Sequence, residues 1–172
     1  MRFIKKATMG LLTVAMSVAA FSAAASDSDK WATIEKLTIS PAQAVGIAAT
    51  QDHGDVIEME IDFRDGVPYY EVEVQGDEHK HKLTIDAESG EVISNKVNDG
   101  FFKSKEKPKA TLVMQKAITI AERETGARVK EAELKTKGDD SYYDIEAVTN
   151  KEKYEVKIDA HTGEILKLEK DD

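Results

Sequence analysis

The stretch Tyr70-Glu71-Val72-Glu73-Val74 and the later turn Asp86-Ala87-Glu88-Ser89-Gly90-Glu91 decide how this chain folds, because both occur twice. Tyr143-Asp144-Ile145-Glu146-Ala147 matches the first segment, and Asp159-Ala160-His161-Thr162-Gly163-Glu164 matches the second, each 73 residues later. A third pair of segments, 44–48 and 117–121, keeps the same offset. Three matches in one register indicate an internal duplication, which sets the architecture of the whole chain.

Each copy carries the pattern of one helix followed by strands. In the first copy, Ser40 is a good N-cap and Pro41 suits the first helical position, and we expect this helix to end near His53-Gly54 with the glycine in the left-handed conformation. The segments that follow alternate apolar and acidic residues with a period of two, which is typical of antiparallel strands with one buried face. The sequence therefore predicts an α+β fold of two tandem repeats, each with one helix packed on an antiparallel three- to four-stranded meander sheet.

The repeated Asp-Ala-x-x-Gly-Glu turn has a structural explanation. The carboxylate of Asp86 or Asp159 can accept hydrogen bonds from backbone amides two or three residues later, and Gly90 or Gly163 allows a positive φ. These residues close a hairpin, so we assign them no chemistry. A repeat of this size buries little surface alone, and we expect the two copies to dock through an edge strand of each or through their helices.

Composition along the chain sets the expected domain boundaries. Residues 1–25 have a basic start, a short apolar run and small residues before an expected cleavage site after Ala25, which are the features of a secretory signal peptide. The expected order after it is a flexible leader at 26–37, repeat one at 38–95, a lysine-rich linker at 96–110, repeat two at 111–168 and a charged tail at 169–172.

The chain is acidic and has no cysteine, with a formal net charge of −9. Loss of residues 1–25 would remove three basic residues and no acidic residue, so the exported chain is more negative still. An acidic surface repels nucleic acid and anionic lipid, so we expect neither as a partner and no stable membrane insertion after signal cleavage. The absence of cysteine excludes disulfides and thiolate metal sites, and it argues against a lipid anchor.

The repeated pattern resembles the PepSY domain family. The resemblance rests on the small-residue helix, the Tyr-acidic-aliphatic-acidic segment and the Asp-Ala-x-x-Gly-Glu turn, and it covers nearly all of the mature chain in two copies. This family occurs as a propeptide module of secreted metallopeptidases, in a spore germination protein and as free-standing exported proteins. The resemblance implies a free-standing binding module that inhibits an exported peptidase or assists its folding. The signal peptide implies a periplasmic location, or alternatively an extracellular one.

No catalytic motif accompanies this pattern. The sequence has no HExxH, no GxSxG and no phosphate-binding glycine loop, so we expect no enzyme activity and no cofactor. Partner binding would then rest on aromatic anchors, for which the candidates are Tyr69, Tyr142, Phe101 and Phe102. For Phe101 and Phe102, packing into a groove between the repeats is the alternative interpretation.

A second class of function is kept as the alternative, an envelope protein that binds a metal ion or a small ligand as a sensor. His79 and His81 lie two residues apart on an expected strand, so their side chains share one face and can approach one ion. Repeat two has Glu152 and Tyr154 at these positions. The histidine pair is therefore not part of the repeated design, and we predict no metal site.

Overall fold

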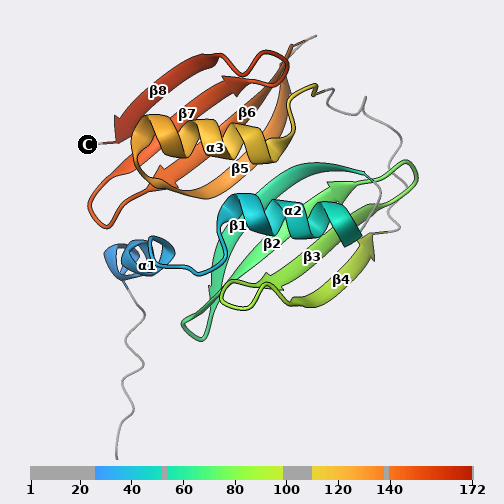
Figure 1. The fold of residues 1–172 in the computed structure, drawn as a ribbon, viewed down its shortest axis with the longest axis horizontal. Coiled ribbons are helices and arrows are strands. Elements are labelled where there is room, and N and C mark those ends of the chain that lie inside the picture. The colour runs from blue at the N-terminus through green and yellow to red at the C-terminus, as the bar shows by residue number, and fades with distance from the viewer. Residues whose placement is uncertain (1–25, 52–53, 99–109, 138–139, 172) are drawn as a thin grey trace, which may run out of the picture.

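The computed structural model describes residues 26–51, 54–98, 110–137 and 140–171. All eight strands form one antiparallel sheet in the order β4-β3-β2-β1-β5-β6-β7-β8 (Figure 1). The elements in chain order are α1 (Asp27–Ile34), α2 (Pro41–Gln51), β1 (Asp55–Arg64), β2 (Val67–Gln75), β3 (Lys80–Asp86), β4 (Val92–Asn98), α3 (Met114–Thr125), β5 (Arg128–Lys137), β6 (Asp140–Val148), β7 (Lys153–Asp159) and β8 (Ile165–Asp171).

The two repeats join through their first strands, β1 and β5. Met59 lies opposite Ala132, its own counterpart in the other repeat, and Glu58 and Glu60 lie opposite Glu133 and Glu131. The pairing is therefore symmetric about Met59 and Ala132. The predicted fold class is confirmed, with one difference in assembly: the two four-stranded meanders merge into a single sheet. The expected docking through one edge strand of each repeat is present, and it removes two unpaired strand edges.

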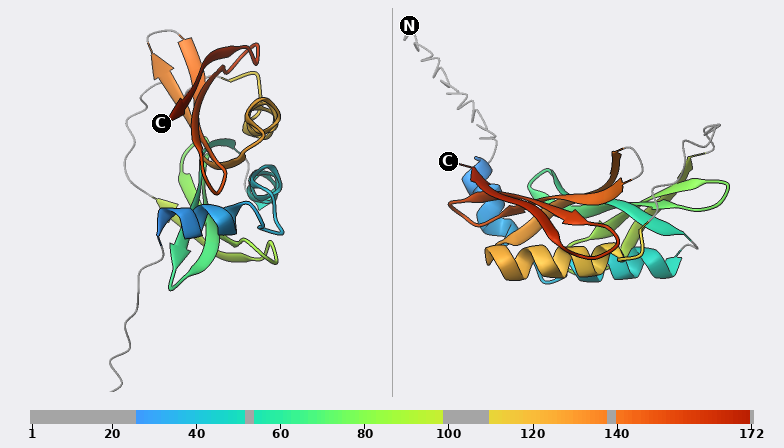
Figure 2. Two further views of the ribbon diagram at one scale, coloured as in Figure 1. Left: turned by 90° about the vertical axis from the view of Figure 1, so that its left-hand side faces the viewer. Right: turned by 90° about the horizontal axis from the view of Figure 1, so that it is seen from above.

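Helices α2 and α3 lie side by side and cover one face of this sheet (Figure 2). The inward positions of the strands are fully buried beneath them, including Val72, Leu83, Ile145 and Val156. The helices also contact each other, because the Gln115 Nε2 atom donates a hydrogen bond to the Ala42 carbonyl at 3.1 Å. The two expected modes of docking, edge strands and helices, therefore occur together.

The repeated turns are built as the sequence predicts. The Asp86 Oδ1 atom accepts hydrogen bonds from the amides of Glu88 and Ser89 at 3.0 and 2.7 Å. The Asp159 carboxylate accepts the matching pair at 2.9 and 2.7 Å. Gly90 and Gly163 have φ values of 75° and 78°. The amide hydrogen bonds lower the pKa of both aspartates, because they stabilise the charged form.

The repeated tyrosines anchor the segment before each helix. Tyr70 donates a hydrogen bond to the Ile39 carbonyl and Tyr143 donates to the Leu112 carbonyl, both at 2.6 Å. Both phenol rings are buried. Burial raises the pKa of each hydroxyl to about 12. Each tyrosine therefore stays a neutral donor and ties its helix to the sheet.

The predicted cap at the start of α2 is confirmed, because the Ser40 hydroxyl accepts from the Gln43 amide at 3.1 Å and the Gln43 side chain accepts from the Ser40 amide at 2.8 Å. Gly126 ends α3 in the left-handed conformation, with φ 68°. The prediction for Gly54 is wrong, since it is not among the glycines with positive φ. A Cβ at Gly54 would lie 2.5 Å from the Gln75 carbonyl oxygen, so close backbone approach explains this glycine.

Two expected flexible ends are ordered instead. Within the expected leader, Ser26 caps helix α1, and Ile34 and Leu37 are buried, because these apolar side chains pack into the common core. Within the expected charged tail, β8 continues to Asp171, which pairs with Lys153 across the ladder. Figure 1 shows α1 at one end of the β1–β5 pairing. The expected signal peptide and most of the expected linker lie outside the described residues.

Candidate functional site

The sheet face opposite α2 and α3, which we call the open face, carries mostly charged side chains. Its centre holds four glutamates contributed by the two joining strands, Glu58, Glu60, Glu131 and Glu133. Directly opposed like charges destabilise a strand pair. Burial raises the pKa of Glu58, and Glu73 and Glu133 raise it further. Burial likewise raises the pKa of Glu60, with Glu131 adding to the effect.

Lysines from the outer strands surround this acidic centre. In repeat one, Lys80 pairs with Glu73 at 2.8 Å, and Lys82 pairs with Glu71. In repeat two, Asp144 lies between Lys135 and Lys157, with both ammonium groups at 3.1 Å. The lysine hydrogen bonds lower the pKa of Asp144 against the opposing effect of its burial. The open face is therefore a layer of paired charges around an acidic middle.

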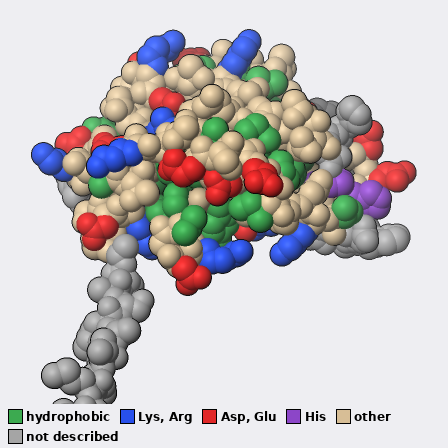
Figure 3. Space-filling view, turned by 60° about the horizontal axis from the view of Figure 1, so that its bottom comes forward, with side chains coloured by type: hydrophobic (Ala, Val, Ile, Leu, Met, Phe, Trp, Pro, Cys, Tyr) green, Lys and Arg blue, Asp and Glu red, His purple; other side chains and the backbone are tan. Residues whose placement is uncertain are grey.

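One corner of the open face is apolar and concave, and we call it the Tyr69 patch. It holds a pocket of about 270 Å³, and its exposed apolar members Val67 and Ile93 are 56% and 58% accessible. Figure 3 brings forward the end of the molecule that carries the β1–β2 and β3–β4 turns, and it shows hydrophobic side chains exposed among charged ones. The lining residues are Arg64, Asp65, Val67, Pro68, Tyr69, Thr84, Asp86 and Ile93.

Tyr69 forms the fixed floor of this patch. Its hydroxyl donates a hydrogen bond to Asp62 Oδ2 at 2.8 Å, and the Arg64 guanidinium lies 5.2 Å from its ring centroid. The backbone amide of Phe63 and the Tyr69 hydroxyl together lower the pKa of Asp62. Tyr69 is only 8% accessible, so the expectation of an exposed anchor is wrong for this residue. The exposed groups are Val67 and Ile93, which alternation alone did not distinguish from other strand residues.

Tyr142, the counterpart of Tyr69, has different surroundings. Its ring is half-buried and lies 5.0 Å from the Lys157 ammonium. Asp140 and Ser141 stand where the Tyr69 patch has Val67 and Pro68. The two tyrosines lie on β2 and β6, with β1 and β5 between these strands, so the structure does not bring them together. Phe101 and Phe102 lie outside the described residues.

The histidine pair lies at the outer part of repeat one. His81 on β3 has its Nδ1 atom 3.3 Å from the Asn95 Oδ1 atom, and His79 Nε2 lies 3.9 Å from Glu78. Across the described ranges, no group of three or more His, Cys, Asp or Glu side chains is placed to hold a metal ion. Metal binding at His79 and His81 was the less favoured alternative, and the absence of a metal site there stays a prediction.

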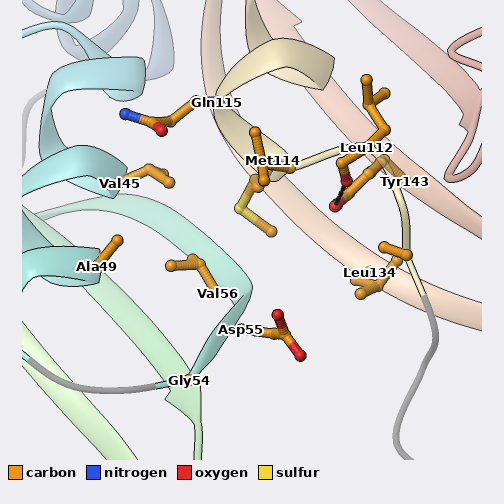
Figure 4. Close-up of a pocket in the computed structure, with 12 residues that line it drawn as sticks. Val45, Ala49, Gly54, Asp55, Val56, Leu112, Met114, Gln115, Leu134 and Tyr143 are labelled. Carbon is orange, nitrogen blue, oxygen red and sulfur yellow. Dashed lines mark hydrogen bonds between the residues drawn. The ribbon is translucent and has the colours of Figure 1, made fainter.

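A second concave site lies on the helix side, near the start of α3, and we call it the Asp55 pocket (Figure 4). Its volume is about 110 Å³. Figure 4 shows the Asp55 carboxylate on the β1 side of the pocket, and the Tyr143 hydroxyl bonded to the Leu112 carbonyl. The lining residues are Val45, Ala49, Gly54, Asp55, Val56, Ala110, Leu112, Val113, Met114, Gln115, Leu134 and Tyr143.

Comparison with known proteins identifies similar chains. The family model for the peptidase propeptide and YPEB domain, PepSY, matches residues 38–96 and 114–169. The chain is 26% identical to the uncharacterized protein YkoJ of Bacillus subtilis (strain 168) over 173 residues, which span 98% of each chain. Its structure is similar to a "putative lipoprotein" from Clostridium difficile 630, with TM-score 0.53 and 25% identity over 82% of this chain and 99% of that one. The Bacillus megaterium YpeB C-terminal domain matches with TM-score 0.32 and 22% identity, over 78% of this chain and 66% of that one.

Proposed function

The chain belongs to the PepSY family of peptidase propeptide and YpeB domains, and we propose that it is a non-catalytic exported module that binds a protein partner through the Tyr69 patch. The observation that carries this proposal is the exposure of Val67 and Ile93 around a rigidly held ring. Apolar side chains exposed around a concave site, with charged residues at the rim, are typical of protein interaction sites.

The comparison between repeats supports this choice of surface. Repeat two has the same fold and the same tyrosine, yet Asp140, Ser141 and Lys157 replace the apolar Val67 and Pro68 and the neutral Thr84. The fold alone therefore does not require an apolar surface here. We infer that the Tyr69 patch serves binding, since repeat two keeps an apolar residue at the position of Ile93 but has polar residues at those of Val67 and Pro68.

The charge of the molecule favours a partner with a basic surface. The formal net charge is −9, and the centre of the open face holds opposed glutamates. An acidic field steers a basic protein toward this face and disfavours acidic ones. The family description, a peptidase propeptide, supports an exported peptidase as the partner. Inhibition of that peptidase, or assistance to its folding, is the expected consequence of binding.

Export is part of the proposal. Its support is the signal-peptide pattern of residues 1–25 together with the structural similarity to a chain described as a lipoprotein. Among the helices that the structure describes, none has the length and apolarity needed to cross a bilayer. A fusion of residues 1–25 to a periplasmic reporter tests this part, because retention of the reporter in the cytoplasm would contradict export.

The matched residues Ile93 and Leu166 give a direct test of partner binding. They are counterparts in the two repeats and are 58% and 56% accessible. The mature chain is immobilised, and exported proteins from the producing organism are captured on wild type, on Ile93→Lys and on Leu166→Lys. We expect a specific partner with peptidase activity that Ile93→Lys loses and Leu166→Lys retains. Capture that is equal on all three proteins, or the absence of any partner, would contradict the Tyr69 patch.

A further inference from the structure

The Asp55 pocket has a filled counterpart in the other half of the molecule. Every residue that lines it has an equivalent 73 positions away, and most of these equivalents are similar in size. Several positions differ strongly, and three of them matter for the charge and the space beside the tyrosine. Ala49, Asp55 and Ala110 in the pocket correspond to Glu122, Arg128 and Leu37 in the counterpart.

In the counterpart, an apolar side chain and a guanidinium group stand at two of these positions. Leu37 is only 5% accessible. The Arg128 Nη2 atom donates hydrogen bonds to the carbonyls of Leu37 at 2.9 Å and Ile39 at 3.2 Å. Ile39 is the same carbonyl that accepts from Tyr70. The fold therefore creates, beside each repeated tyrosine, a position where a cation can be bound by backbone carbonyls.

The Asp55 pocket keeps the acceptors of this position but lacks the donor. The Leu112 carbonyl accepts one hydrogen bond from Tyr143 and has a second lone pair. Asp55 adds a carboxylate close enough to Tyr143 to raise, together with burial, the pKa of that hydroxyl. The Asp55 side chain makes no hydrogen bond or ion pair with any other residue of the described ranges. Asp55 is exposed at the mouth of the pocket, and the lining is mostly apolar, with Val45, Met114 and Leu134 among its residues.

We propose that the Asp55 pocket is a binding site for a positively charged side chain, arginine or lysine, presented by a polypeptide. The aliphatic stem of such a side chain would pack where Leu37 packs in the counterpart. Its charged end would meet the Leu112 carbonyl and the Asp55 carboxylate. A cation on a flexible apolar stem satisfies both parts of this site, because the stem is desolvated while the charge stays paired.

The size of the pocket limits the ligand to a single side chain, part of which stays outside the pocket. Its volume of about 110 Å³ is below that of the roughly 150 Å³ engineered cavity that holds benzene. The site lies on the helix side of the sheet, away from the Tyr69 patch, and does not depend on the proposed function. It gives the chain a second point of contact, selective for charge, where the Tyr69 patch selects for apolar groups.

Blocked tripeptides test the proposal directly. The probes are glycine-arginine-glycine, its lysine analogue and its citrulline analogue, which has the shape of arginine without the charge. Methyl NMR signals of Val45, Leu112 and Met114 are followed during titration of the intact mature protein. We expect saturable shifts at these methyls with arginine or lysine at roughly millimolar concentration, as suits a single side chain. Citrulline should bind at least about tenfold more weakly, a loss of ~1.4 kcal/mol.

Matched variants separate charge from packing. Asp55→Asn removes the carboxylate at the start of β1, and Asp140→Asn makes the same change at the start of β6. We expect the first to abolish the shifts and the second to leave them unchanged. Asp55→Arg combined with Ala110→Leu introduces the residues of the counterpart, and it should fill the pocket and prevent binding. Thermal melts of each variant confirm that the fold is retained.

The proposal is overturned by any of three results. These results are an affinity for citrulline equal to that for arginine, binding that Asp55→Asn retains, and shifts that fall on methyls outside the pocket. None of these results bears on the Tyr69 patch, whose test uses Ile93 and Leu166.

Discussion

Repeats one and two share a scaffold and differ in what surrounds it. Tyr70 and Tyr143 make the same hydrogen bond at the same distance, and Gly90 and Gly163 make the same turn. Beside the tyrosines, however, Arg128 fills one site with its own side chain, while Asp55 stands beside an open pocket. Residues that are the same in both repeats therefore determine the shape. Residues that differ between the repeats are the better candidates for binding.

The same contrast appears on the open face. The Tyr69 patch is apolar and the surroundings of Tyr142 are polar, although both tyrosines lie at matching positions of the same sheet. A duplicated protein thus contains its own control, because each repeat shows which residues the fold tolerates at a given place. The predictions below use this property, and each compares a residue with its counterpart.

The largest difference in stability is expected between substitutions of Arg128 and of its counterpart Asp55. Arg128→Met would leave the carbonyls of Leu37 and Ile39 without their charged donor and would remove the cation near the half-buried Glu122. We expect a loss of about 2–3 kcal/mol in the free energy of unfolding. Asp55→Asn, at the matching position, should change it by less than about 0.5 kcal/mol. Urea denaturation measures the free energy of unfolding of both variants. Equal losses of this free energy would contradict a difference between the two sites.

Removing the tyrosine hydroxyl should destabilise the two repeats by different amounts. Tyr143→Phe leaves the Leu112 carbonyl without its donor, at a cost of about 1–2 kcal/mol. Tyr70→Phe should cost roughly half as much, because Arg128 still donates to the Ile39 carbonyl. In the Arg128→Met background the two substitutions should become equally costly. Double-mutant analysis of chemical denaturation measures this coupling, and additive losses would exclude it.

Replacing the glycine of the repeated turn should destabilise both repeats by the same amount. Gly90→Ala and Gly163→Ala would each force alanine into a positive φ, at a cost of about 1 kcal/mol. Their Cβ atoms would also lie 3.1 Å from Ile47 and 3.3 Å from Ile120. Gly66→Ala is the control, because its φ is 81° but no atom lies within 4 Å of the added Cβ. Thermal unfolding measures all three, and unequal losses at Gly90 and Gly163 would contradict equivalent turns.

The smallest expected effect is the pH dependence of the two turn aspartates. The pKa of Asp86 and of Asp159 is lowered in the folded chain, so each adds stability that is complete above the unfolded pKa of about 3.9. This stability is lost as the pH falls through the lower, folded pKa. Asp86→Asn and Asp159→Asn should each reduce the steepness of the acid-induced fall in Tm by the same amount. Thermal melts between about pH 2 and pH 7 test this, and a fall in Tm at low pH as steep as that of the wild type would contradict it.

Much of the fold followed from features that are local in the chain. The Ser40 cap, the Asp86 and Asp159 turns and the inward alternation of the strands each involve residues a few positions apart, so the sequence displayed them directly. The duplication made each of these predictions twice. The ends of the chain were mispredicted because α1 is polar in composition and is fixed by burial of Ile34 and Leu37 in a core that the leader itself does not contain.

By itself, the sequence determined two copies of a helix on a four-stranded meander, because alternation, caps and turn residues act over short distances. Only the tertiary structure decided that β1 pairs with β5, since a meander has two free edges and the period-two pattern is the same for both. That pairing placed Arg128 against the Leu37 and Ile39 carbonyls and left the space beside Asp55 open. Both sites bring together residues from distant parts of the chain, so their chemistry depends on how the two repeats assemble.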